Sequence, residues 1–361
     1  MALPYCEIGV INLAICWNSF MLVGTFNSKN STSFKEPFNQ LNIEKGSYTQ
    51  SAGNRVLNVY KLYSTGTSET TCERSFNFDK FDSIYKNKFG DKKIDQNWLI
   101  WFIGFVEGDG AILTFNNRLQ FVVTQKERKI LDEIKDNLGF GRIKHFTSTK
   151  NKNEFHRFIV DNNENILILT HLFNGNFILK HRQSQLEFWI NVLNSKNLNK
   201  EDNQIELLNN NLMPTLKDSW ISGFTDAEGC FNINITSRKD TVTGYRIVPR
   251  FFLDQKNAFE TLNNIHNLFN FGRVSLRSGT QNVYRYSVDS FKSLEPVINY
   301  FNTYPLKTKK QISFLNWSKV YNMLLNKEHL TDEGLLKIRE IKKTININNS
   351  LTRKTGSSSA R

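Results

Sequence analysis

The spacing of hydrophobic residues predicts that one series of helices and strands occurs twice along the chain. After Gly229, hydrophobic side chains occupy every second position as far as Ile235, a period that is typical of a strand with one buried face. The first half shows two short strands, 111–115 and 118–124, that are joined by a tight turn. Segments with the apolar spacing of helices are 129–138 and 258–269. Each half is therefore expected to run helix, strands, helix, strands, helix.

Two hydrophobic helical segments each end in a carboxylate that is followed directly by glycine. The segment 101–110 carries Asp109 at its end, and the segment 220–229, which lies 119 positions later, carries Glu228. Glycine after a helix is common. A carboxylate in the last helical turn, however, lies at the negative end of the helix dipole, where an acid is disfavoured. We therefore expect the two acids to bind a shared cation.

Small residues four positions apart on both segments predict that these two helices pack closely. Positions i and i+4 share one helix face, so each helix has a face without bulky side chains. The small residues are Gly104, Gly108, Gly223 and Ala227. Helices packed along these faces end at the same level and bring Asp109 and Glu228 together. Glu107 and Asp226 lie about 200° away around the helix and are expected to form hydrogen bonds that fix the helix pair.

Further segments repeat in the same order, which indicates one fold of roughly 100 to 120 residues used twice. The paired segments are 118–126 with 250–256, 138–143 with 269–274, 157–161 with 285–289, and 179–183 with 306–310. A period this long excludes a solenoid and suggests pseudo-twofold symmetry, as in a dimer. The predicted fold class is α+β. Two αββαββα-type halves place their antiparallel sheets side by side in a polar saddle, behind a poorly ordered N-terminal extension.

Composition favours a polyanionic partner and a hard metal ion. The 361 residues include 47 Lys and Arg against 34 Asp and Glu, which gives a net charge of +13. The four cysteines have no paired spacing, so the sequence indicates neither a disulfide framework nor a zinc site. The six histidines form no close pair, which leaves carboxylates as metal ligands. Oxygen ligands favour an ion such as Mg²⁺.

The predicted organisation comprises five segments. They are an N-terminal extension at 1–95, a first domain at 96–195, a linker at 196–211, a second domain at 212–330 and a C-terminal extension with a loose basic tail at 331–361. The N-terminal extension is expected to be largely disordered and to be exon-derived or processed away. Within it, residues 8–26 are apolar but interrupted by polar side chains, which makes a membrane protein a distant alternative.

The two acid-ended helices resemble the paired motifs of the LAGLIDADG homing endonucleases in their single-chain, two-motif form. The resemblance covers about residues 95–325 and implies roles for particular residues. Those implied to bind metal are Asp109, Glu228, Gly108 and Ala227. Those implied to position solvent, or to act near the scissile phosphates, are Gln125, Gln255, Arg182 and Lys309. Arg182 stands where the family more often has Lys, and an arginine holds phosphate but does not exchange a proton.

The resemblance implies a site-specific DNA endonuclease that makes a staggered double-strand break with Mg²⁺ or Mn²⁺ and supports intron mobility. The side chains expected to contact DNA are Asn117, Lys144, Asn232, Asn234, Thr236, Arg238 and Arg277. The protein is expected to be a monomer with an internal pseudo-dimer, located in the mitochondrion. An RNA-binding maturase that assists splicing of its host intron is the alternative. A DNA-binding regulator that does not cut is disfavoured because both acids are retained.

Overall fold

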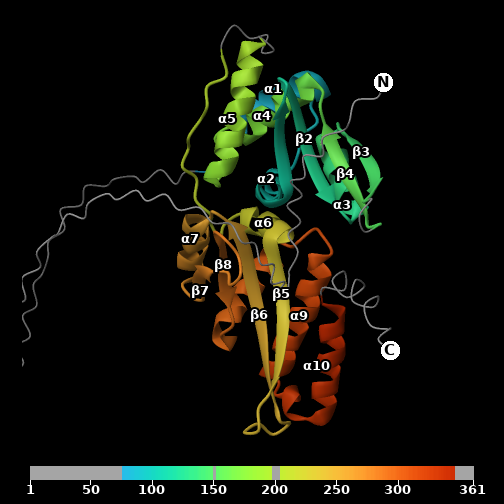
Figure 1. Cartoon of the computed structure of the whole chain (residues 1–361), viewed down its shortest axis with the longest axis vertical. Coiled ribbons are helices and arrows are strands. Elements are labelled where there is room, and N and C mark those ends of the chain that lie inside the picture. The colour runs from blue at the N-terminus through green and yellow to red at the C-terminus, as the bar shows by residue number, and fades with distance from the viewer. Residues whose placement is uncertain (1–74, 149–151, 197–203, 346–361) are drawn as a thin grey trace, which may run out of the picture. The chain divides into compact units, whose positions relative to one another are not determined.

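The computed structural model describes residues 75–148, 152–196 and 204–345, which form two halves of the same design (Figure 1). The first half contains α1 (Asp79–Phe89), α2 (Gln96–Asp109), β1 (Gly110–Phe115), β2 (Arg118–Gln125), α3 (Arg128–Leu138), β3 (Arg142–Thr147), β4 (Glu154–Val160), α4 (Asn163–Phe173) and α5 (Lys180–Ser195). The apolar segment predicted at 8–26 and the tail predicted beyond 345 lie outside the described residues.

The second half repeats the order of the first and adds elements at its end. It contains α6 (Trp220–Glu228), β5 (Gly229–Ser237), β6 (Tyr245–Lys256), α7 (Phe259–Phe269), β7 (Arg273–Leu276), β8 (Val283–Val288), η1 (Phe291–Ser293), α8 (Leu294–Thr303), α9 (Lys310–Leu325), η2 (Glu328–Leu330) and α10 (Asp332–Thr344). No helix among the described residues is both long and apolar enough to span a membrane.

Each half is built on one antiparallel sheet of four strands. The strand orders are β1-β2-β4-β3 and β5-β6-β8-β7, so the two sheets have the same topology. The predicted α+β fold class and its internal repeat are therefore confirmed. In the turn between β1 and β2, Asn116 and Asn117 have φ angles of 46° and 57°. Two successive left-handed residues form the tight hairpin turn that the sequence predicts.

The helices of the described residues cover one face of each sheet, and the two cores are rich in aromatic rings. In the first half, Phe121 of β2 packs between Phe102 and Phe173 of the helices. In the second half, Phe231 of β5 contacts Phe314 and also Trp317 of α9. Each fully buried side chain of this size contributes roughly 2–3 kcal/mol to folding. Alternate strand residues therefore face the helices, and the residues between them face the opposite side.

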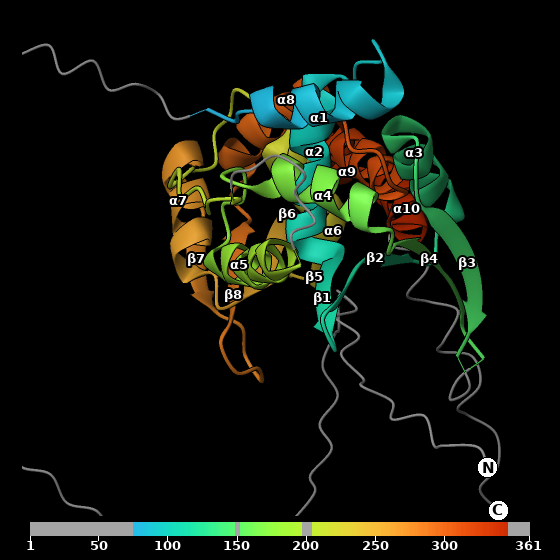
Figure 2. The ribbon, with the colours of Figure 1, turned by 90° about the horizontal axis from the view of Figure 1, so that it is seen from above.

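Helices α2 and α6 pack directly against one another and lie side by side in both ribbon views (Figures 1 and 2). A Cβ atom added at Gly223 would lie 1.8 Å from the backbone oxygen of Trp101. One added at Gly104 would lie 2.2 Å from the backbone oxygen of Trp220. Any side chain at these positions would force the helix backbones apart. The close approach predicted from the small residues is therefore confirmed.

The structure differs from the sequence prediction at the start of the described region, and it shows a folded helix in the predicted C-terminal extension before the predicted loose tail. Residues 75–95, which were expected to lie in a disordered extension, include α1, and this helix buries Phe81 and Tyr85. The Tyr85 hydroxyl donates a hydrogen bond to the Leu138 carbonyl (3.1 Å), so α1 is part of the first half. After residue 331, α10 buries Leu335 and Ile338, so this part of the C-terminal extension is folded.

Candidate active site

The two helix-ending carboxylates lie in one neighbourhood. Asp109 is the last residue of α2 and Glu228 is the last residue of α6, and both are partly buried. A Cβ atom at Gly108 would lie only 2.3 Å from the Ala227 Cβ and 3.0 Å from the Glu228 Cγ. Because the residues at this contact are small, the two helix ends meet, as the sequence predicts.

Burial and mutual repulsion destabilise the charged forms of these two acids. Burial raises the pKa of Asp109 from 3.8 to about 6, although the positive charge of Lys310 opposes the shift. Burial, together with the charge of Asp109, raises the pKa of Glu228 from 4.5 to about 8. Two partly buried carboxylates that repel each other form a site that a cation would stabilise.

The acid two positions before each helix end is buried and joins the two halves. The Trp220 indole of α6 donates a hydrogen bond to Glu107 of α2 (2.5 Å). In the reverse direction, the Trp101 indole of α2 donates to Asp226 of α6 (2.9 Å). The prediction that these acids form hydrogen bonds that fix the helix pair is therefore confirmed. The reciprocal pairing with tryptophan was not anticipated.

Each buried acid also accepts hydrogen bonds from the segment that precedes a later helix. Glu107 accepts from the backbone N–H groups of Ile178 (2.8 Å) and Leu179 (2.5 Å), just before α5. Asp226 accepts from the backbone N–H groups of Lys307 (2.7 Å) and Thr308 (3.1 Å), just before α9. These bonds offset part of the cost of burying a carboxylate. They also fix the starts of α5 and α9 beside the helix ends.

One basic side chain from each half caps the end of the adjacent acid-bearing helix. Arg182 donates to the backbone oxygens of Glu107 (3.0 Å) and Gly108 (3.2 Å). Lys310 donates to the backbone oxygens of Ala227 (2.7 Å) and Thr225 (3.2 Å). Unpaired carbonyls and the negative end of the helix dipole attract cations at such positions. Gly108 and Ala227 are both implied to bind metal by the family resemblance. Their carbonyls accept hydrogen bonds from the side chains of Arg182 and Lys310.

The structure places Lys310, and not Lys309, at the position that corresponds to Arg182. Lys309 is exposed, and its backbone N–H donates to Glu127 (2.9 Å). The sequence comparison matched Leu179 with Leu306 because both precede a lysine. The bonds to the buried acids instead match Leu179 with Thr308, a shift of two positions, whereas the bonds to the helix-end carbonyls match Arg182 with Lys310, a shift of one position from Lys309.

The two glutamines predicted to position solvent differ in their contacts. Gln125 donates from its side-chain nitrogen to the Asp109 carboxylate (2.6 Å), so it lies beside the helix ends. Gln255 is buried, and its side-chain oxygen accepts from the backbone N–H of Lys256 (2.9 Å). The two halves are therefore not equivalent around their acids.

The residues predicted to contact DNA fall into two groups. Four of them lie on the sheet face away from the helices: Lys144, Asn232, Asn234 and Thr236. On β5, the buried residues Phe231 and Ile233 alternate with the last three, so those three face away from the core. The other three make contacts within the protein, Asn117 through its backbone only. The Asn117 carbonyl accepts a hydrogen bond from Lys196, Arg238 pairs with Asp240 (3.5 Å), and Arg277 pairs with Asp254 (3.0 Å).

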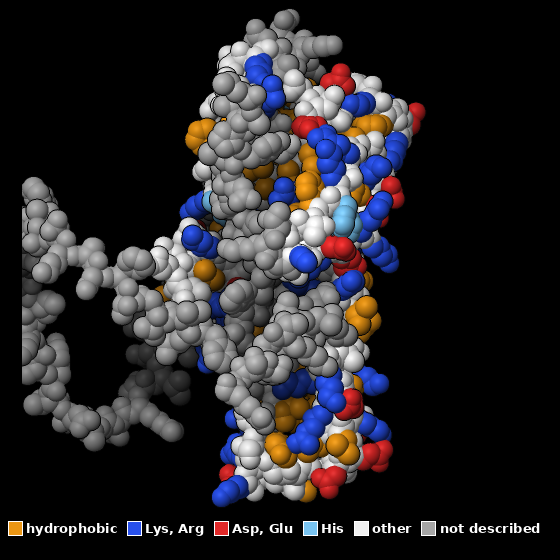
Figure 3. All heavy atoms as spheres, turned by 45° about the vertical axis from the view of Figure 1, so that its right-hand side comes forward, with side chains coloured by type: hydrophobic (Ala, Val, Ile, Leu, Met, Phe, Trp, Pro, Cys, Tyr) orange, Lys and Arg blue, Asp and Glu red, His pale blue; other side chains and the backbone are white. Residues whose placement is uncertain are grey.

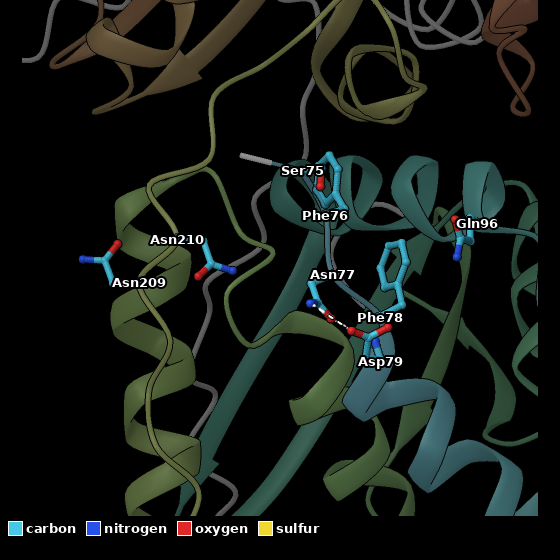
Figure 4. A pocket seen from close by; sticks show the side chains of 8 residues that line it. All are labelled: Ser75, Phe76, Asn77, Phe78, Asp79, Gln96, Asn209 and Asn210. Carbon is cyan, nitrogen blue, oxygen red and sulfur yellow. Dashed lines mark hydrogen bonds between the residues drawn. The ribbon is translucent and has the colours of Figure 1, made fainter. Parts of the chain in front are cut away.

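Two cavities lie away from the helix ends. One, of about 500 Å³, is lined by polar side chains that include Asn77, Asp79, Gln96 and Asn210 (Figure 4). Asn77 and Asp79 hydrogen-bond to each other there (3.3 Å), and this cavity combines no catalytic groups. The other lies beside the free part of β6 and includes Arg246 and Arg250. The acids at the ends of α2 and α6 therefore remain the candidate active site.

Comparison with known proteins gives the same family from sequence and from structure. The family model for LAGLIDADG endonucleases matches residues 221–321. The "Probable intron-encoded endonuclease 4" of Neurospora crassa is 37% identical over 257 residues, which cover 70% of this chain and 45% of that protein. The chain thus spans less than half the length of that relative. The "Uncharacterized cox1 intron-2 37.2 kDa protein" of Schizosaccharomyces pombe is 30% identical over 286 residues, which cover 79% of this chain and 83% of that protein.

A solved structure extends the comparison over the same region. The LAGLIDADG meganuclease I-AabMI, bound to uncleaved DNA, is 28% identical to this chain and superposes with a TM-score of 0.56. The match covers 68% of this chain and 98% of that meganuclease. The meganuclease I-SmaMI, at 18% identity and a TM-score of 0.56, shows the same fold. The sequence similarity, the strand order and the paired acid-ended helices together show that this chain belongs to the LAGLIDADG endonuclease family.

Proposed function

We propose that this protein is a site-specific DNA endonuclease that hydrolyses one phosphodiester bond in each strand of a duplex and so makes a staggered break. The observation that carries the proposal is the meeting of Asp109 and Glu228 at the adjoining ends of α2 and α6. The relative from Neurospora crassa is named as a probable endonuclease, and the meganuclease of similar fold is bound to DNA, which supports this proposal.

The two carboxylates suit a hard divalent cation such as Mg²⁺ or Mn²⁺. Both have raised pKa values because they are partly buried and close together, and a cation would relieve that cost. Among the described residues no group of three or more His, Cys, Asp or Glu side chains could hold a metal. Two carboxylates are sufficient for Mg²⁺, which keeps several waters and takes substrate phosphates as ligands. When bound, such an ion lowers the pKa of a coordinated water and stabilises the charge on the leaving oxygen.

The protein groups around the acids position them and supply positive charge. Gln125 holds one oxygen of Asp109 by its hydrogen bond, which fixes the orientation of that carboxylate. Arg182 and Lys310 bring one positive charge from each half to the helix ends. These charges would attract the phosphates of a duplex and oppose the repulsion between phosphate and carboxylate. We assign these two residues, together with the acids and Gln125, to catalysis.

We further propose that the two sheets bind the duplex through the faces that the helices leave uncovered. Lys144 in the first half and Asn232, Asn234 and Thr236 in the second lie on those faces. Side chains on alternate strand positions reach base edges in the major groove. A single chain supplies both halves, so we propose a monomer. Relatives are named for introns of cox1 and ND4, and we propose a mitochondrial location on that basis.

The direct test is cleavage of DNA that spans an intronless copy of the host gene, with Mg²⁺ or with EDTA. The natural chain should cut only with Mg²⁺. Asp109→Asn should abolish cleavage and change DNA affinity by less than about tenfold, since phosphate contacts supply most of the affinity. Asp136→Asn, which removes an exposed carboxylate of α3, is the matched control and should cut normally. Full cleavage by Asp109→Asn would refute the assignment. The maturase alternative stays a prediction, and rescue of host-intron splicing would test it.

A further inference from the structure

The uncovered sheet face of the first half carries hydrophobic side chains where the second half carries amides. Leu113 and Phe115 of β1 are 45% and 64% exposed. Their counterparts, 119 positions later in the motif repeat, are Asn232 and Asn234 of β5. The other face of β1 is covered, because Ile112 on that face is buried and pairs with the core residue Phe121.

Two more hydrophobic side chains lie on this face, at its other edge. Phe146 of β3 and Phe155 of β4 are paired in register and stack with ring centroids 5.6 Å apart. Their neighbours Ile143 and Phe158 pair on the core side, so Lys144 and Phe146 face away from the helices. The Arg157 guanidinium lies 4.9 Å from the Phe146 ring and 5.3 Å from the Phe155 ring.

The corresponding arginine of the second half is neutralised. Arg285, which matches Arg157 in the repeat, donates two hydrogen bonds to Asp254, both of 2.6 Å. Asp254 also pairs with Arg277, and the position that matches Asp254 in the first half is Thr124. The first half therefore presents hydrophobic groups beside Arg157, which forms no ion pair with any described residue, and the second half presents amides beside the ion-pair cluster of Asp254, Arg277 and Arg285.

Positive charge surrounds the hydrophobic positions of the first half. Lys144 lies on β3, and Arg118 pairs with Phe115 across the β1–β2 hairpin, whereas Arg142 of β3 is neutralised by an ion pair with Asp161. Figure 3 shows hydrophobic side chains among Lys and Arg side chains on the face seen there. Strand β1 begins directly after Asp109, so its exposed residues extend outward from the candidate active site. A surface of this kind fits a polyanion that presents apolar groups between its charges.

We propose that the first half recognises thymine 5-methyl groups through Leu113, Phe115, Phe146 and Phe155, whereas the second half recognises its bases by hydrogen bonds from amides. This inference rests on the proposed DNA-binding function. The thymine methyl is the apolar group that a base pair presents in the major groove, and apolar side chains discriminate by contact with it. Leu113 and Phe115 are about 6.6 Å apart along β1, which corresponds to about two base pairs.

The test begins with the natural full-length chain in EDTA, where binding is separated from cleavage. A randomised duplex library of about 30 bp is selected for binding, and the chosen duplex is resynthesised with deoxyuridine in place of thymidine in one half at a time. Deoxyuridine lacks only the 5-methyl group. Removing each contacted methyl should weaken binding about fourfold, so two thymines should give about a tenfold or larger loss. The same replacement in the other half should change affinity by less than about twofold.

Variants assign the effect to the hydrophobic residues. The double variant Leu113→Asn, Phe115→Asn changes exposed positions and should lose the part of the thymine preference that these two residues supply, so only the contribution of Phe146 and Phe155 should remain. Leu336→Asn, which alters an exposed leucine of α10, is the matched control and should keep the preference. Thermal melts of both variants show whether they are folded.

The possible outcomes separate the two proposals. Failure to select any duplex would overturn both the DNA-binding function and this inference. Selection of a duplex on which uracil has no effect in either half would leave DNA binding intact and overturn the inference alone. A concentration-dependent dimer of the natural chain that the double variant abolishes would assign the hydrophobic positions to self-association, which also overturns it.

Discussion

Replacement of Glu228 with glutamine is expected to stabilise the folded protein at alkaline pH while it abolishes cleavage. Burial and the charge of Asp109 raise the pKa of Glu228 from 4.5 to about 8. The folded protein therefore holds this proton at pH values where the unfolded chain has already released it. The free energy of unfolding consequently falls as the pH rises from about 4.5 to about 8, and the loss is complete above that range. Glutamine carries no charge and avoids the loss.

The size of the effect follows from the shift in pKa. One pKa unit corresponds to about 1.4 kcal/mol, so the shift sets a ceiling of about 5 kcal/mol. The side chain is partly exposed, and solvent screens the repulsion with Asp109. We therefore expect the Glu228→Gln variant to gain about 2 kcal/mol at high pH. For a chain of 361 residues that gain raises the melting temperature by about 2–4 °C.

Thermal melts at about pH 5 and about pH 9, without divalent ions, provide the assay. The variant should melt well above the natural protein at the higher pH and close to it at the lower pH. Added Mg²⁺ should stabilise the natural protein at the higher pH, because a ligand that binds the folded state raises its stability, and should stabilise the variant less. Glu187→Gln, which removes an exposed carboxylate of α5, is the control. A variant that melts at or below the natural protein at the higher pH would refute the reasoning.

Two further substitutions test the helix pair and its basic caps. Gly223→Ala places a Cβ atom 1.8 Å from the Trp101 carbonyl oxygen, so the free energy of unfolding measured in urea should fall by about 3 kcal/mol. A fall of less than about 1 kcal/mol would contradict the close packing. Lys310→Met should reduce the rate of DNA cleavage by about a hundredfold, because it removes a positive charge from the helix ends. Lys309→Met should have little effect on cleavage. If Lys309→Met instead reduced cleavage more than Lys310→Met, Lys309 would be the residue that corresponds to Arg182, as the sequence predicts.

The features that the sequence predicts best are those in which residue type and spacing act locally. The small residues spaced four apart predict close helix packing, because a helix face without bulky side chains lets two backbones approach each other. The meeting of the two acids then follows, because helices packed along these faces end at the same level. Alternation predicts β5 correctly, since Phe231 and Ile233 face the core. The turn at Asn116 and Asn117 is equally local, because asparagine tolerates the left-handed region.

The features that the sequence does not predict depend on distant partners or on ambiguous patterns. The Trp220–Glu107 bond joins residues 113 positions apart, and neither residue alone indicates the other. The β1 strand is hydrophobic on both faces, so alternation cannot identify Leu113 and Phe115 as exposed. Helix α1 is short and follows a polar stretch, and its burial becomes apparent only once the surface that it covers is formed.

The crossed indole–carboxylate bonds restrict how this protein can evolve by recombination. Each half contributes one donor and one acceptor, and each partner is supplied by the opposite half. A chimera that takes one half from a distant relative would retain both bonds only if that relative carries tryptophan and a carboxylate at the same places. Otherwise one buried acid of the retained half would lose its indole donor and one buried tryptophan would lose its carboxylate acceptor, at a cost of several kcal/mol. Viable exchanges should therefore occur among relatives that share both pairs, while the strands that we propose to contact DNA diverge freely between them.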